Sequence, residues 1–308
     1  MDNLPVITAV DGSDHSLRAL EWALAAARSR GTELLVAHIR TDHTKALPMA
    51  GSVPILPPVD SVPLLTHVQE QIEAREDSAE LPPVRYETVD GSPGSGLVAL
   101  SERGQLLVLG SRGRGGFASL LLGSVSRACT ARAACPVVVV PHAARTEEAE
   151  AAKADGPAPV VLGFSLEETS DVVVEFAFEE AKRRGAPLQV ITTYPVPLST
   201  LALMGGDIEG AGATGRPEIE ADLRETQSHR LRPFVQRYEE VQVQQVVAAS
   251  DAAGRLVVAS QTAGLLVVGR HRRRLSADTF LGSAANAVLQ HAHCPVAVVP
   301  PQPASPLG

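Results

Sequence analysis

Short apolar runs alternate with longer amphipathic segments along the chain. In the first half, the apolar runs predict strands at Val6–Val10, Leu34–Ile39, Val84–Val89, Leu106–Leu109 and Val137–Val140. Between them, apolar residues at helical spacing predict helices at Asp14–Arg30, Pro63–Glu76, Gly96–Arg103 and Ser124–Ala134. Regular alternation of strand and helix implies an α/β domain with a parallel sheet and helices on both faces.

The same pattern occurs a second time further along the chain, with related residues. Val160-Val-Leu-Gly-Phe-Ser aligns with the first strand of the first copy, and Leu265-Leu-Val-Val-Gly269 aligns with its fourth. We therefore interpret the 308 residues as a tandem duplication with one domain per copy. The predicted organisation is a first domain at 1–142, a charged, Ala-rich linker at 143–158, a second domain at 159–301 and a tail at 302–308.

Composition narrows the classes of partner. Lys and Arg number 27 and Asp and Glu 35, for a net charge of −8, which argues against general affinity for nucleic acid or anionic membranes. The basic cluster Arg270–Arg274 is best explained as a solvated loop, with anion binding as the next alternative. No apolar run has the length of a membrane span, and the three cysteines form no Cys-x-x-Cys pair. The expectation is a soluble cytoplasmic protein without a metal site.

Residues suited to binding an anion follow the first and fourth predicted strands of the first copy. In a doubly wound sheet, ligands bind at the carboxyl ends of the strands where the chain order reverses. We expect Asp11 to meet Gly110 and Gly113 there, with the glycines supplying positive φ angles and close main-chain approach. The helix that opens at Gly123-Ser124 directs N–H groups and its positive end at the ligand. Added to these are the hydroxyls of Ser124 and Ser126 and the charges of Arg112 and Arg114.

Each of these features also has an explanation that involves no ligand. The glycines could serve turns and caps, Asp11 could be a simple N-cap of the helix from Asp14, and the arginines could be solvated. The occurrence of all of them at one predicted sheet edge favours a phosphorylated, nucleotide-like ligand.

The spacing Gly110-x2-Gly113-x9-Gly123-Ser124, preceded by Val10-Asp-Gly-Ser13, resembles the ATP-binding pattern of universal stress proteins. The resemblance covers nearly the whole chain twice and indicates a tandem member of that family. It implies a Rossmann-like domain in each copy, with five parallel strands in the order 3-2-1-4-5. It also implies ATP in the first copy, with Mg²⁺ left open, and backbone near Ile39 reading the adenine edge. The site residues that it implies are Asp11, Ile39, Gly110, Arg112, Gly113, Gly123, Ser124, Val125 and Ser126.

The second copy departs from this pattern at the positions that matter. Ser165 takes the place of Asp11, and Arg272 takes the place of Gly113. A bulky side chain at the second of these positions would fill the path of the phosphates. The sequence therefore predicts one nucleotide per chain, bound in the first domain.

Three classes of function remain open at this point. The favoured one is an ATP-binding regulatory or sensor protein of the stress response, with an unidentified protein partner and at most weak ATPase activity. The alternative is a nucleotide-using enzyme with slow ATP hydrolysis or nucleotidyl transfer, although the chain has no Gly-x4-Gly-Lys loop and no evident base for activating water. The third is a purely structural interaction module. We also expect the two copies to pack as an intramolecular pseudo-dimer, with a homodimer of chains left open.

Overall fold

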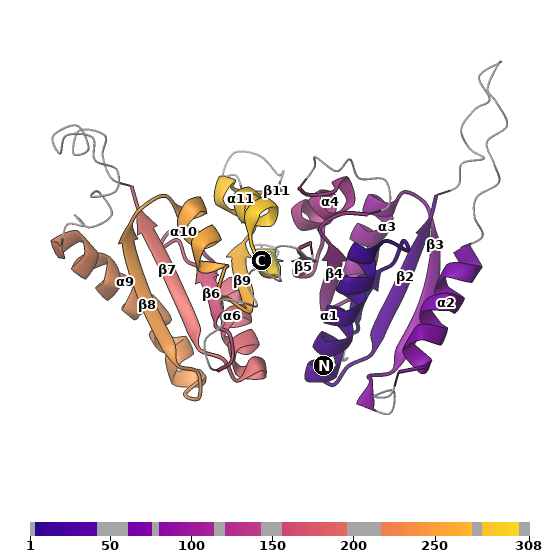
Figure 1. The fold of residues 1–308 in the computed structure, drawn as a ribbon. Helices are drawn as coiled ribbons and strands as arrows, with labels where there is room; N and C mark the ends of the chain where they lie inside the picture. Colours follow the sequence, from indigo (N-terminus) through magenta and orange to yellow (C-terminus); the bar gives the residue numbers. More distant parts are fainter. Residues whose placement is uncertain are drawn as a thin grey trace, which may run out of the picture. The chain divides into compact units, whose positions relative to one another are not determined.

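The computed structural model describes residues 4–41, 61–75, 80–113, 121–142, 156–195, 217–272 and 279–301. The chain divides into two compact units, Met1–Val140 and Pro141–Gly308. Both units are α/β (Figure 1). The predicted linker falls largely outside the described residues, as do the basic residues Arg273 and Arg274. In the described part of the chain, no helix has the length and apolar character needed to cross a membrane.

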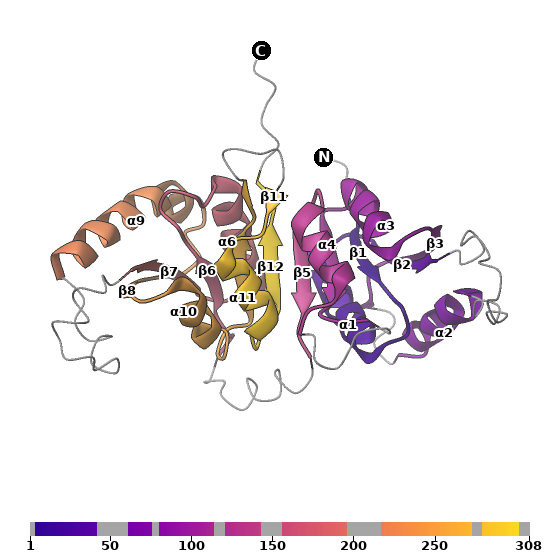
Figure 2. The same ribbon diagram turned by 90° about the horizontal axis from the view of Figure 1, so that it is seen from above.

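The first unit is a parallel sheet with the strand order β3-β2-β1-β4-β5. Helices α1 and α2 cover one face of this sheet, and α3 and α4 cover the other (Figure 2). Its elements in chain order are β1 (Val6–Ala9), α1 (Asp14–Arg30), β2 (Leu34–Arg40), α2 (Ser61–Glu73), β3 (Val84–Asp90), α3 (Pro93–Leu100), a 3₁₀ turn (Ser101–Arg103), β4 (Leu106–Gly110), α4 (Ser124–Arg132) and β5 (Val137–Val140).

The second unit repeats this arrangement with the strand order β8-β7-β6-β9-β12. Its helices α6 and α9 lie on one face and α10 and α11 on the other (Figure 2). The elements are β6 (Val160–Gly163), α6 (Asp171–Arg184), β7 (Leu188–Tyr194), α9 (Pro217–Arg237), β8 (Val243–Ala249), α10 (Ala252–Ala259), β9 (Leu265–Gly269), α11 (Ser283–His291) and β12 (Val296–Val299). The predicted fold class, two doubly wound α/β domains in tandem, is confirmed.

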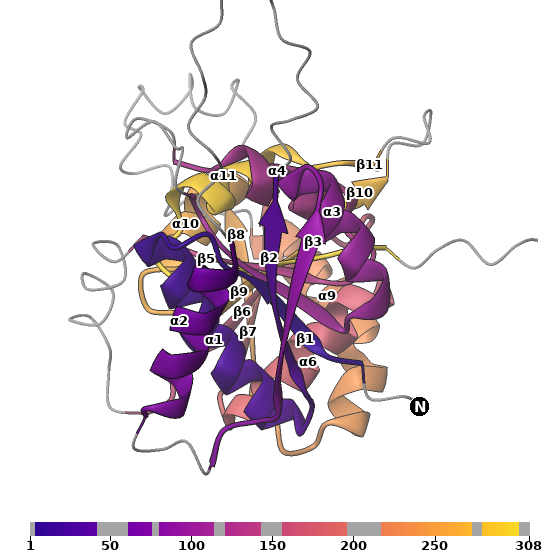
Figure 3. The same cartoon turned by 90° about the vertical axis from the view of Figure 1, so that its right-hand side faces the viewer.

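The strand register brings all the carboxyl ends of a sheet to one edge. In the first unit, Val6 of β1 lies beside Leu34 of β2 and Leu106 of β4, and all three strands run in the same direction. The parallel course of β2 and β3 is visible in Figure 3. The chain order reverses between β1 and β4, and loops from both strands leave the same edge of the sheet there.

Local sequence explains how the elements begin and end. Helix α1 starts at the N-cap Ser13, whose hydroxyl accepts a hydrogen bond from Ser16 N–H, and ends at Gly31 in the left-handed conformation. Helix α3 starts at Pro93, ahead of the predicted Gly96, because proline has no N–H to lose in a first turn. In the second unit, the hairpin of β10 (His271–Arg272) and β11 (Thr279–Phe280) was not predicted.

The three cysteines lie in the cores of the units. Cys129, Cys135 and Cys294 are free and buried. Burial raises the pKa of Cys129 to about 12, and it raises the pKa of Cys294 to the same value. A raised pKa reduces the thiolate, which is the reactive form, so Cys129 and Cys294 behave as packing residues.

We therefore expect the folded chain to resist a thiol reagent such as DTNB at pH 8. At a pKa of about 12 only roughly one thiol in ten thousand is ionised at that pH, and burial also blocks access. The same sample in denaturant should release three equivalents of the chromophore at once, because all three cysteines are then exposed. Rapid labelling of any cysteine before unfolding would contradict the buried placement.

Candidate functional site

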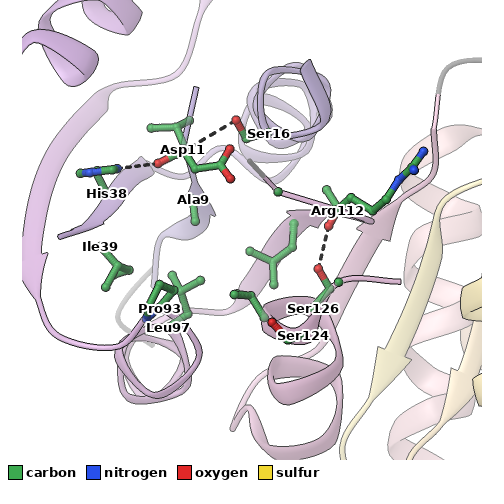
Figure 4. Close-up of a pocket in the computed structure, with 16 residues that line it drawn as sticks. Ala9, Asp11, Ser16, His38, Ile39, Pro93, Leu97, Arg112, Ser124 and Ser126 are labelled. Carbon is green, nitrogen blue, oxygen red and sulfur yellow. Dashed lines mark hydrogen bonds between the residues drawn. The ribbon is translucent and has the colours of Figure 1, made fainter. Parts of the chain in front are cut away.

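A cavity of about 460 Å³ opens at the carboxyl edge of the first unit's sheet. This is the size of a small-molecule pocket. The cavity lies where β1, β2 and β4 end and where α3 and α4 begin (Figure 4). All the site residues that the sequence predicted line it, namely Asp11, Ile39, Gly110, Arg112, Gly113, Gly123, Ser124, Val125 and Ser126.

One part of the cavity wall is apolar. Ile39 at the end of β2 lies close to Pro93 and Leu97 of α3 (Figure 4). Leu97 is buried at 1% exposure and Ile39 at 8%, so both are held rigidly by the core. An apolar wall of this kind suits the face of a flat aromatic ring.

Asp11 organises the loop that joins β1 to α1. Its Oδ1 accepts hydrogen bonds from Ser13 N–H at 3.0 Å and from Ser13 Oγ–H at 2.6 Å. Asp11 N–H donates to Ser16 Oγ at 3.3 Å. The helix cap is therefore Ser13 rather than Asp11, and Gly12 makes the turn between them with φ at 80°. The carboxylate is fixed through one oxygen at the cavity wall.

The glycines act by close approach rather than by the positive φ angles that we expected. Among the described glycines, positive φ occurs at Gly12 but at neither Gly110 nor Gly113, which corrects that expectation. A Cβ on Gly110 would lie 2.5 Å from the carbonyl oxygen of His15 in α1. A Cβ on Gly113 would lie 2.5 Å from Asp11 Oδ2. The end of β4 therefore packs directly against the backbone of α1, and a side chain at position 113 would displace the Asp11 carboxylate.

Helix α4 presents its amino end to the cavity. Gly123 is its N-cap and offers no side-chain cap, while Arg127 N–H donates to Gly123 O to close the first turn. The amides of Ser124, Val125 and Ser126 belong to the first turn and have no partner inside the helix. This end of the helix combines amide donors with the positive end of the helix dipole.

Ser126 has a different role from the one expected of its hydroxyl. Its Oγ–H donates to Gly110 O at 2.7 Å, and the side chain is buried. Ser126 therefore ties α4 to the end of β4, and its amide is what remains for a ligand. The hydroxyl of Ser124 is on the exposed side of the same turn and lines the cavity.

Arg112 contributes main chain to the cavity, but Figure 4 shows its guanidinium directed away from Asp11 and Ser124. The contribution of its positive charge to ligand binding stays a prediction of the sequence. Arg114 lies outside the described residues.

Sequence reasoning did not select His38 or Ser16, although both line the cavity. His38 Nδ1 lies 2.8 Å from Val10 O. The available signal was position, because His38 precedes Ile39 at the carboxyl end of a buried strand. Ser16 falls in the first turn of a helix that begins at the same edge.

The second unit secures the matching edge with different residues. Arg230 of α9 donates to Leu166 O at 2.7 Å and to Thr169 O at 2.9 Å. Its guanidinium also lies 5.5 Å from the centre of the Phe164 ring. Ser165, at the position of Asp11, donates its N–H to Thr169 Oγ1 at 2.9 Å. A cation here holds the loop that a carboxylate organises in the first unit.

The fold and the site define a class of protein, a tandem pair of doubly wound α/β domains. The first domain has a cavity at the carboxyl edge of its sheet, with one apolar wall and one polar wall. The sequence profile of the Universal stress protein family matches residues 4–141 and 158–300. Universal stress protein Rv2005c of Mycobacterium tuberculosis is 32% identical over 308 residues, covering 95% of this chain and 96% of the relative. Universal stress protein Rv1996 of the same organism is 30% identical over 338 residues, covering 99% and 98%.

A solved structure agrees with this assignment at the level of the fold. A universal stress protein from Archaeoglobus fulgidus DSM 4304 superposes with a TM-score of 0.66 at 19% identity, covering 97% of this chain and 99% of its own. The chain belongs to the universal stress protein family, a family of stress-response proteins, as the sequence pattern predicted.

The close packing at Gly110 leads to a stability prediction with a matched control. Gly110→Ala should lower the free energy of unfolding of the first unit by about 1–3 kcal/mol, because its Cβ meets main chain that has no room to move. Urea unfolding followed by fluorescence measures this directly, since the chain has one tryptophan, Trp22, which lies in α1.

Gly269→Ala is the control, at the corresponding position of the second unit. Its Cβ would lie 3.2 Å from Cγ2 of Val173, a side-chain atom that can shift slightly. This variant should leave the Trp22 transition unchanged. If Gly110→Ala unfolds at the same urea concentration as the parent, the tight contact with α1 has no energetic weight.

Proposed function

We propose that the first unit binds ATP and that the chain acts as a nucleotide-binding regulatory protein of the stress response. The observation that carries this proposal is the cavity itself, in which an apolar wall at Ile39 and the amino end of α4 face one ligand-sized space. The two features suit the two ends of a nucleotide, which are a flat base and a chain of phosphates.

The main chain at the end of β2 supports an adenine base. Along β2, Leu34 N–H and Arg40 O bond toward β3, whereas Glu33 O and Ala37 O accept from Val6 and Val10 of the β1 segment. Main-chain groups alternate in direction along a strand, so Ile39 N–H and C=O point to the β1 side. Since β1 ends at Ala9, these groups face the cavity end of the sheet.

An adjacent donor and acceptor distinguish the purine bases. Ile39 N–H can donate to adenine N1, and Ile39 C=O can accept from the adenine amino group. Guanine presents N–H and C=O at the same two positions, so a donor would face the Ile39 N–H and an acceptor would face the Ile39 C=O. This polarity favours ATP over GTP.

The other end of the cavity suits phosphates. The first-turn amides of α4 are donors at the positive end of a helix dipole, which is a common phosphate-binding arrangement. The segment from Gly110 to Gly113 lies close to His15 and Asp11, and this brings further main-chain groups to the phosphate end of the cavity. A Mg²⁺ ion would be held mainly by the phosphates, with Asp11 as the carboxylate within the cavity lining.

A regulatory role fits the chemistry better than catalysis. The cavity lining holds one carboxylate, Asp11, whose Oδ1 is engaged with Ser13, and one imidazole, His38, whose Nδ1 is engaged with Val10 O. Neither arrangement resembles a base held against an attacking water. We expect slow hydrolysis at most. The cytoplasmic location, the protein partner and the pseudo-dimer or homodimer remain predictions of the sequence.

We further propose one nucleotide per chain. In the second unit, Arg230 holds the loop after β6, and Ser165 replaces the carboxylate of Asp11. The position of Gly113 is occupied by Arg272, which belongs to β10. The carboxyl edge of the second unit's sheet thus lacks the counterparts of Asp11 and Gly113.

Gly123→Asp and Gly282→Asp test this assignment as a matched pair. Both glycines are N-caps with extended backbone, at ψ 157° and 159°, and aspartate is a favoured N-cap residue. Neither variant should therefore lose thermal stability. In the first unit, however, the new carboxylate lies where phosphates would bind and should raise the Kd for ATP by at least about tenfold.

Isothermal titration calorimetry on the full chain gives both the Kd and the number of sites. The parent and Gly282→Asp should each bind one ATP with the same Kd. Two sites per chain, or a loss confined to Gly282→Asp, would refute the assignment to the first unit. Steady phosphate release over many turnovers would instead favour the alternative function, a nucleotide-using enzyme.

A double-mutant cycle tests whether Asp11 and the glycine loop act together. Gly113→Ala should weaken ATP binding by pushing Asp11 Oδ2 out of place, and Asp11→Ala should weaken it by removing the carboxylate. The double variant should lose less than the sum of the two, with a coupling of about 0.5–3 kcal/mol, because both changes remove the same anchor. Additive losses measured by calorimetry would show that the two residues act separately.

A further inference from the structure

The hydrogen bonding between the β1 segment and β2 stops one step before the position at which it would include the Ile39 amide. Val10 N–H donates to Ala37 O at 2.9 Å, which is the last backbone hydrogen bond between these segments. The next step of a parallel ladder would join Ile39 N–H to Val10 O. Among the described residues, that backbone bond is not formed.

The carbonyl of Val10 is satisfied by a side chain instead. His38 Nδ1 lies 2.8 Å from Val10 O, and because a carbonyl only accepts, this nitrogen carries the proton and donates. Figure 4 shows the imidazole beside the end of β1, bonded to the Val10 carbonyl. The side chain thus occupies the acceptor that the Ile39 amide would otherwise use.

The second unit contains the same device with a different donor. Thr192, which aligns with His38, donates its hydroxyl to Phe164 O at 2.9 Å. Phe164 aligns with Val10, and its N–H donates to Ile191 O at 2.8 Å as Val10 N–H does to Ala37 O. A hydroxyl on a short, β-branched side chain therefore reaches this carbonyl from this position of the strand.

We propose that His38 is a positioning residue for base recognition, because its imidazole occupies the Val10 carbonyl and so keeps Ile39 N–H open for a purine base. This inference rests on the proposed nucleotide site and adds the residue that holds its donor available. Without a donor at position 38, Val10 O lies next to the free Ile39 amide, and the ladder extends by one hydrogen bond.

Two substitutions of almost equal shape isolate this effect. Both His38→Thr and His38→Val remove the imidazole from the cavity wall and leave a β-branched side chain, but only threonine keeps a donor. Thr192 shows that such a hydroxyl can reach the carbonyl. A difference between the two variants therefore reports the hydrogen bond and not the change in cavity shape.

The first measurement needs no nucleotide. Amide hydrogen exchange of the full chain, followed by NMR, should show Ile39 exchanging fast in the parent and in His38→Thr. In His38→Val, exchange at Ile39 should slow by at least about tenfold because the amide is recruited to Val10 O, while Ala37 stays equally protected in all three. Equal exchange at Ile39 in the threonine and valine variants would overturn the proposal.

The second measurement is titration with ATP and with inosine triphosphate, whose base presents N–H and C=O where adenine presents N1 and an amino group. His38→Val should bind ATP at least about tenfold more weakly than His38→Thr, with the preference for ATP over inosine triphosphate reduced toward equality. Equal ATP affinity in the two variants, or an unchanged preference, would overturn the role in base recognition.

The two measurements separate failure of this proposal from failure of the proposed function. If the parent binds no ATP but amide exchange at Ile39 responds to the substitutions as described, His38 does control the Ile39 amide and the nucleotide assignment is wrong. If ATP binds to the parent and to Gly282→Asp but Ile39 does not respond, the site stands and His38 has no positioning role.

Discussion

The end of β1 is the constraint on which the rest of the site depends. Strands β2 and β4 flank β1 on opposite sides. Where β1 ends, the main-chain N–H and C=O groups that would have paired with it must find other partners. Most of them are satisfied within the protein. His38 donates to Val10 O, Ser126 donates to Gly110 O, and Gly123 N–H donates to Ser111 O at 2.7 Å. The donors that remain, at Ile39 and in the first turn of α4, mark where a ligand can bind.

Duplication shows that the fold does not require this particular edge. Both units keep the strand order, the helix layers and a side-chain donor to the carbonyl at the end of the first strand. The loop that follows is held by the partly buried carboxylate of Asp11 in one unit and by Arg230 in the other. An arginine donating to two carbonyl oxygens supplies hydrogen bonds from a charged donor, which are among the stronger ones. The second unit therefore completes its edge with its own residues.

The sequence predicted the fold well because the strands are buried on both faces. Runs such as Leu106–Leu109 and Val137–Val140 differ from the observed strands by one residue or none. The start of α3 was placed too late, because Pro93 favours a first helical turn while its neighbours Gly94 and Gly96 weaken the apolar pattern. The hairpin of β10 and β11 has too few residues to produce any periodicity.

The sequence named residues that line the cavity, but not the contacts that each of them makes. Motif spacing pointed to the residues that follow the strand ends, and the family resemblance added Ile39 and Val125. It could not show that Gly113 leaves room for the Asp11 carboxylate without adopting a positive φ angle, or that Ser126 turns its hydroxyl inward. These depend on distances between segments that lie far apart in the chain. His38 was missed for the same reason, since a histidine at a strand end has no meaning until its carbonyl partner is known.

The proposed ligand would bind two parts of the first unit at once. Ile39 lies on β2 and the first-turn amides lie on α4, which follows β4, and β2 and β4 are on opposite sides of β1 in the strand order. A nucleotide that accepts from both would connect them through hydrogen bonds that no side chain supplies. Its binding energy would then go into fixing the relative positions of β2 and α4. Since the cavity lining holds no base poised to activate water, that energy would serve to order the edge rather than to stabilise a transition state. This is the physical distinction that the proposed function draws between a nucleotide sensor and an ATPase.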